Sequence, residues 1–211
     1  MTTLPLASIY THALQGHPCT VWEGDLAPQP LPTHAWLASA GAADRALLAH
    51  CEGPTLDIGC GPGRMTEALA VSGHAVLGID VVPEAVRQTR TRGVPALQRS
   101  VFDPLPGEGR WETALLADGN IGIGGDPVAL LERARQLVQP DGRVVVDVAP
   151  WGTGVVTRHV RLETRHGRSG RFPWTVVGAD AVQAVAYAAG LGRATGYRRD
   201  DRWWAVVEAH A

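Results

Sequence analysis

Short apolar runs alternate with amphipathic segments along most of this chain. The apolar runs predict strands at residues 55–58, 75–80, 94–98, 111–117 and 143–148. Apolar positions at helical spacing predict helices at 65–71, at 83–92 and from Pro127 onward, where Asp126-Pro127 is typical of a helix start. Strands that alternate with helices of this length favour right-handed crossovers and a parallel sheet covered on both faces.

The two ends of the chain depart from this alternation. The first 53 residues are irregular and rich in proline before a helix expected at about 35–50. Near the other end, a helix is expected at 180–189, with Asp180 and Gln183 resembling a capping box. Strands at 194–199 and 202–208 follow, and the two residues between them allow only an antiparallel pairing. The pattern therefore predicts an α/β, doubly wound, mostly parallel sheet whose last strand is reversed.

Length and composition favour one soluble domain. The chain has 211 residues, of which 45% are hydrophobic and 19% charged. No apolar run approaches the roughly 20 residues that span a membrane, and the N-terminus lacks the basic and apolar regions of a secretory signal. We expect a cytoplasmic protein of bacterial type that does not bind membranes.

Several function classes are excluded by what the sequence lacks. All 19 basic residues are arginine, so a phosphate-binding P-loop lysine and a pyridoxal phosphate Schiff base are impossible. Cys19, Cys51 and Cys60 form no CxxC pair, which argues against a disulfide framework and a metal site. The net charge of −2 gives no overall field that would attract nucleic acid.

The stretch TLDIGCGPGR at residues 55–64 is the strongest functional signal. Gly59 and Gly61 allow the backbone to approach a ligand, and Gly63 allows the next helix to begin without a clash. Asp80 ends the second strand, where a carboxylate accepts from ribose hydroxyls, so an adenosine ligand is indicated. A tight turn without a ligand is the alternative. A nicotinamide dinucleotide is disfavoured because the spacing is not GxGxxG and because Asp57 would repel a pyrophosphate.

Residues 55–148 resemble the class I S-adenosylmethionine-dependent methyltransferases. The similar motifs are LDIGCGPGR, GID and LVQPDGRVVVDV. This resemblance implies a Rossmann-like sheet of seven strands and S-adenosylmethionine as cofactor, with S-adenosylhomocysteine as product. It also implies that Asp57 serves the methionine end, that Asp80 holds both ribose hydroxyls, and that Val81 packs on the adenine.

The adenine pocket departs from the family pattern. The family has an acid at the end of the third strand, and in SVFDPLP that position falls on Ser100. Either the serine hydroxyl replaces the acid, or Asp103 does, or Asp103 is only a turn residue before Pro104. The cofactor-binding residues that the resemblance implies are Asp57, Gly59, Cys60, Gly61, Gly63, Asp80, Val81, Ser100, Val101, Phe102, Asp103, Asp118 and Gly119.

The stretch DGNIGIGGD at 118–126 follows the fourth strand. In the family this region lies beside the methionine moiety and the acceptor, and its four glycines favour a close backbone approach. Asp118 would then meet the cofactor ammonium and Asn120 the acceptor. A flexible surface loop is the alternative. The stretch lacks the NPPY-like signature, which disfavours methylation of nucleic-acid bases or glutamine.

Methyl transfer needs alignment more than catalytic side chains, and a base only if the acceptor loses a proton. We expect residues 1–53 to form a lid, with Tyr10 and Trp22 in it, and residues 151–175 to form an insertion after the fifth strand. Both segments are expected to cover the cofactor. The candidate bases are His12, His17, His34 and His159; His12 and His159 are taken as the catalytic candidates, and each is alternatively a surface residue.

The insertion is locally basic. It holds Arg158, Arg161, Arg165, Arg168 and Arg171 against Glu163. This is either a solvated hairpin face or a clamp for an anionic acceptor, in which Arg158 and Arg161 would bind the substrate. The patch is too short and too poor in aromatic residues to indicate nucleic acid.

The sequence thus predicts methyl transfer to a small-molecule acceptor, with an anionic acceptor as one option. A first alternative keeps S-adenosylmethionine but uses it for aminocarboxypropyl transfer or cyclisation. A second alternative is a cofactor-binding protein without catalysis.

Overall fold

A seven-stranded sheet forms the centre of the molecule. The computed structural model describes residues 2–24 and 26–210. In sheet order the strands are β11 (Ala194–Arg199), β12 (Arg202–Glu208), β7 (Val138–Val148), β6 (Trp111–Leu116), β3 (Thr55–Ile58), β4 (Val76–Asp80) and β5 (Ala96–Gln98). All neighbouring pairs from β7 to β5 are parallel, whereas β12 is antiparallel to both β7 and β11. This confirms the predicted fold class with its reversed last strand.

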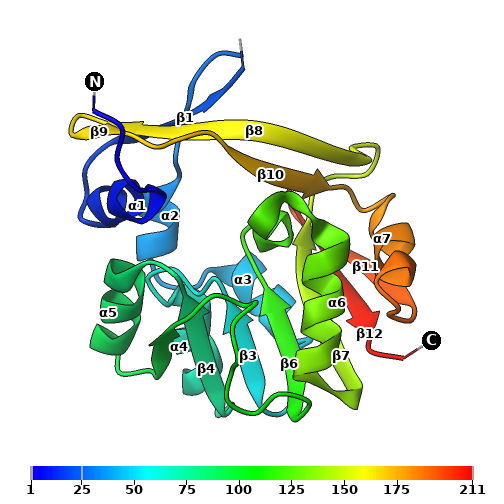
Figure 1. Cartoon of the computed structure of the whole chain (residues 1–211). Helices are drawn as coiled ribbons and strands as arrows, with labels where there is room; N and C mark the ends of the chain where they lie inside the picture. Colours follow the sequence, from blue (N-terminus) through cyan, green and yellow to red (C-terminus); the bar gives the residue numbers. More distant parts are fainter. Residues whose placement is uncertain (1, 25, 211) are drawn as a thin grey trace.

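Helices cover both faces of this sheet, as Figure 1 shows. They are α3 (Ala42–Leu48), α4 (Arg64–Val71), α5 (Pro83–Thr91), α6 (Pro127–Leu137) and α7 (Val182–Ala188). Leu116 and Val146 pack with α6 and α7, whereas their neighbours Leu115 and Val145 pack with α3 and α4. Adjacent side chains of a strand point to opposite faces, so these apolar strands are buried on both sides. None of the helices in the described ranges is long and apolar enough to cross a membrane.

A second, antiparallel sheet lies over the carboxyl ends of the parallel strands (Figure 1). Its strands are β10 (Phe172–Val177), β8 (Val155–Thr164), β1 (Cys19–Glu23) and β2 (Gln29–Pro30), with β9 (Gly167–Arg168) paired to β8. We call it the upper sheet. The Thr175 hydroxyl donates to the Gly125 carbonyl at 2.6 Å, which ties β10 to the 3-10 helix η1 (Asn120–Gly125) after β6. The upper sheet therefore stands where the ligand of a doubly wound fold binds.

The N-terminal part of the chain is more regular than predicted. Besides β1 and β2 it contains α1 (Leu6–Leu14), which packs under the upper sheet, and α2 (Thr33–Leu37). The single helix expected at about 35–50 is wrong, because residues 38–41 separate α2 from α3. The Gly41 amide donates to the Asp44 carboxylate at 2.6 Å, and this contact starts a new helix.

One further local prediction is wrong. Asp180 does not cap α7: its carboxylate accepts instead from the Gly152 amide at 3.0 Å and from the Gly154 amide. A contact between distant segments overrides the local signal there. Residues 139–142 bulge out at the start of β7, where Val138 pairs with Trp111 and Arg143 with Thr113.

Candidate functional site

The glycine loop between β3 and α4 has the open backbone that the sequence predicted. Gly59, Gly61 and Gly63 have φ of 72°, 53° and 87°, a left-handed region that favours glycine. A Cβ on Gly63 would lie 2.7 Å from the Thr89 hydroxyl, so glycine is required there. A Cβ on Gly61 would meet nothing within 4 Å. The backbone at Gly61 is therefore the part of the loop that a ligand can approach.

Asp80 lies at the carboxyl end of β4 and supports this loop. Its carboxylate accepts from the Gly61 amide at 3.0 Å and from the Val82 amide at 2.8 Å. Burial raises the pKa of Asp80, and these two hydrogen bonds oppose that rise. Each carboxylate oxygen keeps a second lone pair, so Asp80 can still accept from a ligand.

Apolar surface lies exposed next to Asp80. Val81 is 56% exposed and Phe102 is 50% exposed, whereas Val101 is buried in the core. The Asp103 carboxylate accepts from the Ser100 amide at 3.0 Å, and the Ser100 hydroxyl accepts from the Phe102 amide at 3.3 Å. Asp103 thus closes the turn before Pro104. Val81 and Phe102 are the exposed apolar groups available to an adenine ring.

Asp57 is buried below the loop. The Thr66 hydroxyl donates to its carboxylate at 2.6 Å. Burial, together with the negative charges of Asp118 and Asp80, raises the pKa of Asp57 to about 7, although the Thr66 hydrogen bond opposes the rise. A nearby positive charge would lower this pKa again, so ionisation of Asp57 is coupled to what binds above it.

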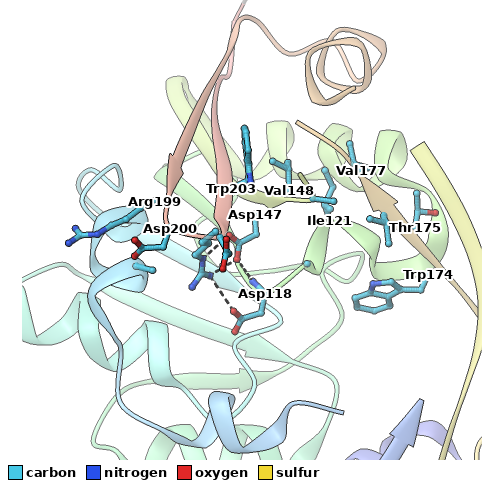
Figure 2. Close-up of a pocket in the computed structure, with 16 residues that line it drawn as sticks. Asp118, Ile121, Asp147, Val148, Trp174, Thr175, Val177, Arg199, Asp200 and Trp203 are labelled. Atoms are coloured by element: carbon cyan, nitrogen blue, oxygen red, sulfur yellow. Dashed lines mark hydrogen bonds and ion pairs between the residues drawn. The ribbon is translucent and has the colours of Figure 1, made fainter. Parts of the chain in front are cut away.

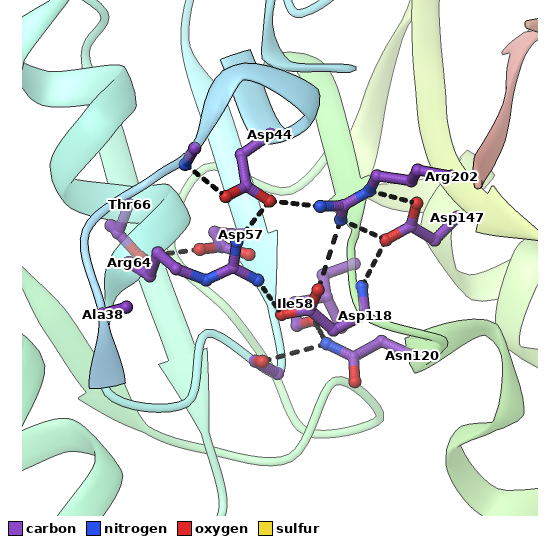
Figure 3. Close-up of polar contacts among 12 residues, drawn as sticks. Ala38, Asp44, Asp57, Ile58, Arg64, Thr66, Asp118, Asn120, Asp147 and Arg202 are labelled. Atoms are coloured by element: carbon purple, nitrogen blue, oxygen red, sulfur yellow. Dashed lines mark hydrogen bonds and ion pairs between the residues drawn. The ribbon is translucent and has the colours of Figure 1, made fainter. Parts of the chain in front are cut away.

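An ionic network joins the glycine loop to the start of β12 (Figure 3). Its members are Asp44, Arg64, Asp118, Asp147 and Arg202. Arg64 pairs with Asp44 and, at 2.5 Å, with Asp118. Arg202 pairs with Asp44 and Asp147 and, at 3.2 Å, with Asp118. Burial raises the pKa of Asp147. At Asp44 burial also acts to raise the pKa, but the hydrogen bonds from Arg64 and Gly41, together with the charges of Arg64 and Arg202, outweigh it and lower the pKa.

Sequence reasoning found only Asp118 among these five residues. Asp147 interrupts the apolar run VVVDV, and Arg202 begins an apolar strand after two aspartates. A charged residue in a strand buried on both faces is a signal for a paired interior charge. That signal could have identified Asp147 and Arg202.

Asp118 and Asn120 follow β6 and approach the glycine loop. Asp118 has φ of 53°, which is uncommon for a residue other than glycine and is found at ligand sites. The Asn120 amide donates to the carbonyls of Ile58 and Gly59 at 2.8 and 2.9 Å. Its nitrogen therefore holds the loop, although we expected Asn120 to contact the acceptor. Asp118 remains partly exposed between the loop and a cavity.

That cavity encloses about 620 Å³ between the two sheets (Figure 2). Its floor is formed by Asp118, Asp147 and Val148 at the ends of β6 and β7. Residues 174–177 of β10 form one wall, and residues 199–203, from the ends of β11 and β12 and the turn between them, form another. The volume suits a small-molecule ligand.

The predicted catalytic and substrate residues of the upper sheet lie outside the cavity lining. Val160 and Leu162 of β8 are buried, so the alternation of a strand puts His159 and Arg161 on the opposite face. His159 is exposed. Arg158 pairs with Glu23 at 2.8 Å.

The remaining candidates in the two covering segments are either packed against other residues or exposed. Arg161 lies 5.5 Å from the centre of the Trp22 ring. Tyr10, in α1, packs against Val82 and Ala85 at the start of α5. His34 is exposed in α2.

His12 belongs to a cluster of three imidazoles instead. Its ring centre lies 4.5 Å from that of His166 and 6.1 Å from that of His17, and His17 lies 4.7 Å from His166. The cluster joins α1 to the turn between β8 and β9. In the described residues, no group of His, Cys, Asp or Glu is arranged to hold a metal ion.

Acid is expected to loosen this junction. Desolvation, followed by the charges of His12, Arg165 and His17, lowers the pKa of His166 below 6.5. The unfolded state therefore binds protons more tightly, and the stability that His166 contributes is lost as the pH falls below about 6.5. Melting curves at neutral and mildly acidic pH should show a smaller acid-induced loss in His166→Gln than in the wild type. His34→Gln is the control, and an equal loss in both variants would contradict the prediction.

A family model and several known proteins match part of this chain. The model of the family described as methyltransferase domain matches residues 55–142. Ubiquinone biosynthesis O-methyltransferase of Xylella fastidiosa is 32% identical over 97 residues, which cover 43% of this chain and 39% of that enzyme. An uncharacterised protein in transposon TN4556 of Streptomyces fradiae is 32% identical over 136 residues. The chain spans 39% of the length of each of these two relatives.

Solved structures show the same fold. A SAM-dependent methyltransferase from Bacteroides fragilis, in complex with S-adenosyl-L-homocysteine, superposes with a TM-score of 0.81 at 21% identity, and covers 98% of this chain and 95% of its own. The 1,6-didemethyltoxoflavin-N1-methyltransferase of Burkholderia thailandensis has a TM-score of 0.59 at 21% identity, with 82% and 80% covered. The first of these likenesses includes the upper sheet, because it extends over nearly the whole chain.

Proposed function

Since residues 55–142 belong to the methyltransferase-domain family and the chain has the class I S-adenosylmethionine-dependent methyltransferase fold, we propose that it transfers a methyl group from S-adenosylmethionine to a small-molecule acceptor. One observation carries the proposal. The open backbone at Gly61, the free lone pairs of Asp80 and the exposed Val81 and Phe102 lie in a row at the carboxyl ends of β3, β4 and β5. This row suits an adenosine whose methionine end reaches Asp118.

The residues present fit that cofactor. Asp80 would accept from the ribose hydroxyls, and Val81 and Phe102 would hold the adenine. Asp118 would take the ammonium, while Asp57 would act from below through its charge. The structures of the Bacteroides fragilis and Burkholderia thailandensis enzymes contain S-adenosylhomocysteine, which supports the choice of cofactor. When bound, S-adenosylmethionine supplies a methyl group on a sulfonium.

The protein's own contribution is alignment and exclusion of water. In-line displacement requires the acceptor atom, the methyl carbon and the sulfur to lie on one line. The cavity adjoins Asp118, so an acceptor bound there would face the methionine end of the cofactor. We propose that residues 1–53 and 151–175, which build most of the upper sheet, cover this arrangement as a lid.

Cofactor affinity is expected to rise with pH. S-adenosylmethionine carries a net positive charge, which favours the ionised form of Asp57, and the pKa of Asp57 is raised to about 7 in the free protein. Binding should therefore release a proton and tighten by up to about ten-fold between pH 6 and pH 8. Calorimetry at several pH values measures this.

Asp57→Asn should remove most of this pH dependence. S-adenosylhomocysteine, which lacks the sulfonium charge, should show a weaker dependence with the wild-type protein. A slope that Asp57→Asn leaves unchanged would assign the proton to another group.

Product analysis tests the proposed reaction. The protein is incubated with S-adenosylmethionine and a mixture of candidate small molecules, and the products are identified by mass spectrometry. A methylated product together with S-adenosylhomocysteine supports methyl transfer. Methylthioadenosine together with an aminocarboxypropyl adduct or a cyclised product would indicate the alternative chemistry. Cofactor binding without any turnover would favour a non-catalytic protein.

A further inference from the structure

The cavity has two tryptophan walls, and Figure 2 labels both. A Cβ on Gly122 would lie 2.6 Å from the Trp174 Nε1, so Trp174 is packed directly on the η1 backbone. The Arg198 guanidinium lies 4.9 Å from the centre of the Trp203 ring. Trp203 thus already holds one cation on a ring face, and indole is the side chain that attracts cations most strongly.

Negative charge dominates the cavity lining. The charged residues that line it are Asp118, Asp147, Asp200, Asp201, Arg199 and Arg202. Arg202 is already committed to carboxylates of the network, and the chain has no lysine. The described lining therefore has four carboxylates against two guanidiniums, and a cation would balance it better than an anion would.

The two arginines of the insertion that were candidates to bind an anionic acceptor have other partners. Arg158 pairs with Glu23 at 2.8 Å, and Arg161 pairs with Glu163 at 3.5 Å. Neither lines the cavity. Their positions favour the interpretation of the basic insertion as a structural face of the upper sheet over an anion clamp.

We propose that the acceptor is a positively charged small molecule that is methylated on an amine nitrogen, and that it binds between Trp174 and Trp203 above Asp118 and Asp147. The proposal rests on the proposed methyl transfer and adds the chemical class of the acceptor. Trp174 and Trp203 provide flat apolar walls, and the carboxylates select the charge.

The reaction balances with groups already named. The bound ammonium first loses a proton to solvent. The lone pair of the neutral amine then forms the nitrogen–carbon bond to the methyl group while the carbon–sulfur bond breaks. The electron pair of that bond stays on sulfur, giving S-adenosylhomocysteine and a methylated ammonium.

Matched pairs of probes test this assignment. The protein is loaded with S-adenosylhomocysteine, and this loading, measured by calorimetry, tests the cofactor part separately. Binding of 2-phenylethylamine and tryptamine is then compared with binding of phenylacetate and indole-3-acetate, which have similar shapes and the opposite charge. We expect the amines to bind at least about ten-fold more tightly than the carboxylates.

Substitution of two exposed aspartates at the cavity rim tests whether the carboxylates select the charge of the ligand. Asp200→Asn combined with Asp201→Asn should reduce the preference for amines at least about three-fold without unfolding the protein, since both side chains are exposed and asparagine tolerates the left-handed backbone at Asp200. Asp141→Asn, an exposed acid near the start of β7 and outside the cavity lining, is the matched control. Amine binding no tighter than carboxylate binding, including no binding of either at millimolar concentration, overturns the proposal. Failure of S-adenosylhomocysteine to bind would overturn the proposed function instead.

Discussion

Asp80→Ala is expected to weaken S-adenosylhomocysteine binding by about 100-fold or more. In the proposed complex Asp80 accepts hydrogen bonds from both ribose hydroxyls, and hydrogen bonds to a charged group contribute about 1.5–3 kcal/mol each. The variant also frees the Gly61 and Val82 amides, which Asp80 holds in the protein without cofactor. Both effects weaken binding, and isothermal calorimetry measures their sum.

Three controls separate cofactor recognition from loop collapse. Asp80→Asn keeps the shape and one carbonyl acceptor, so its loss should be smaller than that of Asp80→Ala. Asp103→Ala removes an aspartate from the turn after β5 and should change affinity little, because Asp103 bonds to Ser100. NAD should not bind to any of the proteins. If Asp80→Ala bound with unchanged affinity while its melting curve was normal, the ribose assignment would be wrong.

Arg202→Met is expected to lower the free energy of unfolding by about 3–5 kcal/mol, because a buried ion pair that loses one partner leaves uncompensated charge. Asp44, Asp118 and Asp147 would then have Arg64 as the remaining guanidinium of the network. A loss of this size is a large part of the stability of a typical domain. Urea unfolding followed by circular dichroism measures it.

A second substitution identifies the cause of that loss. Arg202→Met combined with Asp147→Asn should recover part of the stability, since the most directly paired carboxylate is then neutral. Arg199→Met, on the same hairpin but exposed, should have little effect. A loss below about 1 kcal/mol in Arg202→Met would mean that the contacts of Arg202 act as an exposed ion pair.

The central sheet could be predicted because its signals are local. Each strand from β3 to β7 has an apolar run, and turn residues or a helix start separate the runs. The two residues between β11 and β12 fix the antiparallel direction by chain length alone. The glycine loop also lies within one turn of chain, so its open backbone was readable from TLDIGCGPGR.

The upper sheet and the network could not be read in the same way. Cys19 of β1 pairs with Thr164 of β8, and no local pattern indicates which distant segment a short strand joins. Arg202 pairs with Asp44, which lies 158 residues earlier in the chain. We expected Asn120 to contact the acceptor because the family resemblance puts this stretch beside it, yet the Asn120 amide donates to the carbonyls of Ile58 and Gly59. The places of β1, Arg202 and Asn120 in the structure all depend on contacts between residues far apart in the sequence.

The pairing of β1 with β8 also sets an order for folding during synthesis. The ribosome releases the first strand of the upper sheet long before Thr164 exists, so β1 can pair with β2 but not with β8 while the glycine loop and the parallel strands are being made. Closing a loop of this length carries an entropy cost, and contacts so far apart in sequence form slowly. The central sheet is thus free to assemble first and to present the carboxyl ends of its strands as a template. The upper sheet, which lies over the site, is completed only after the last third of the chain has been synthesised.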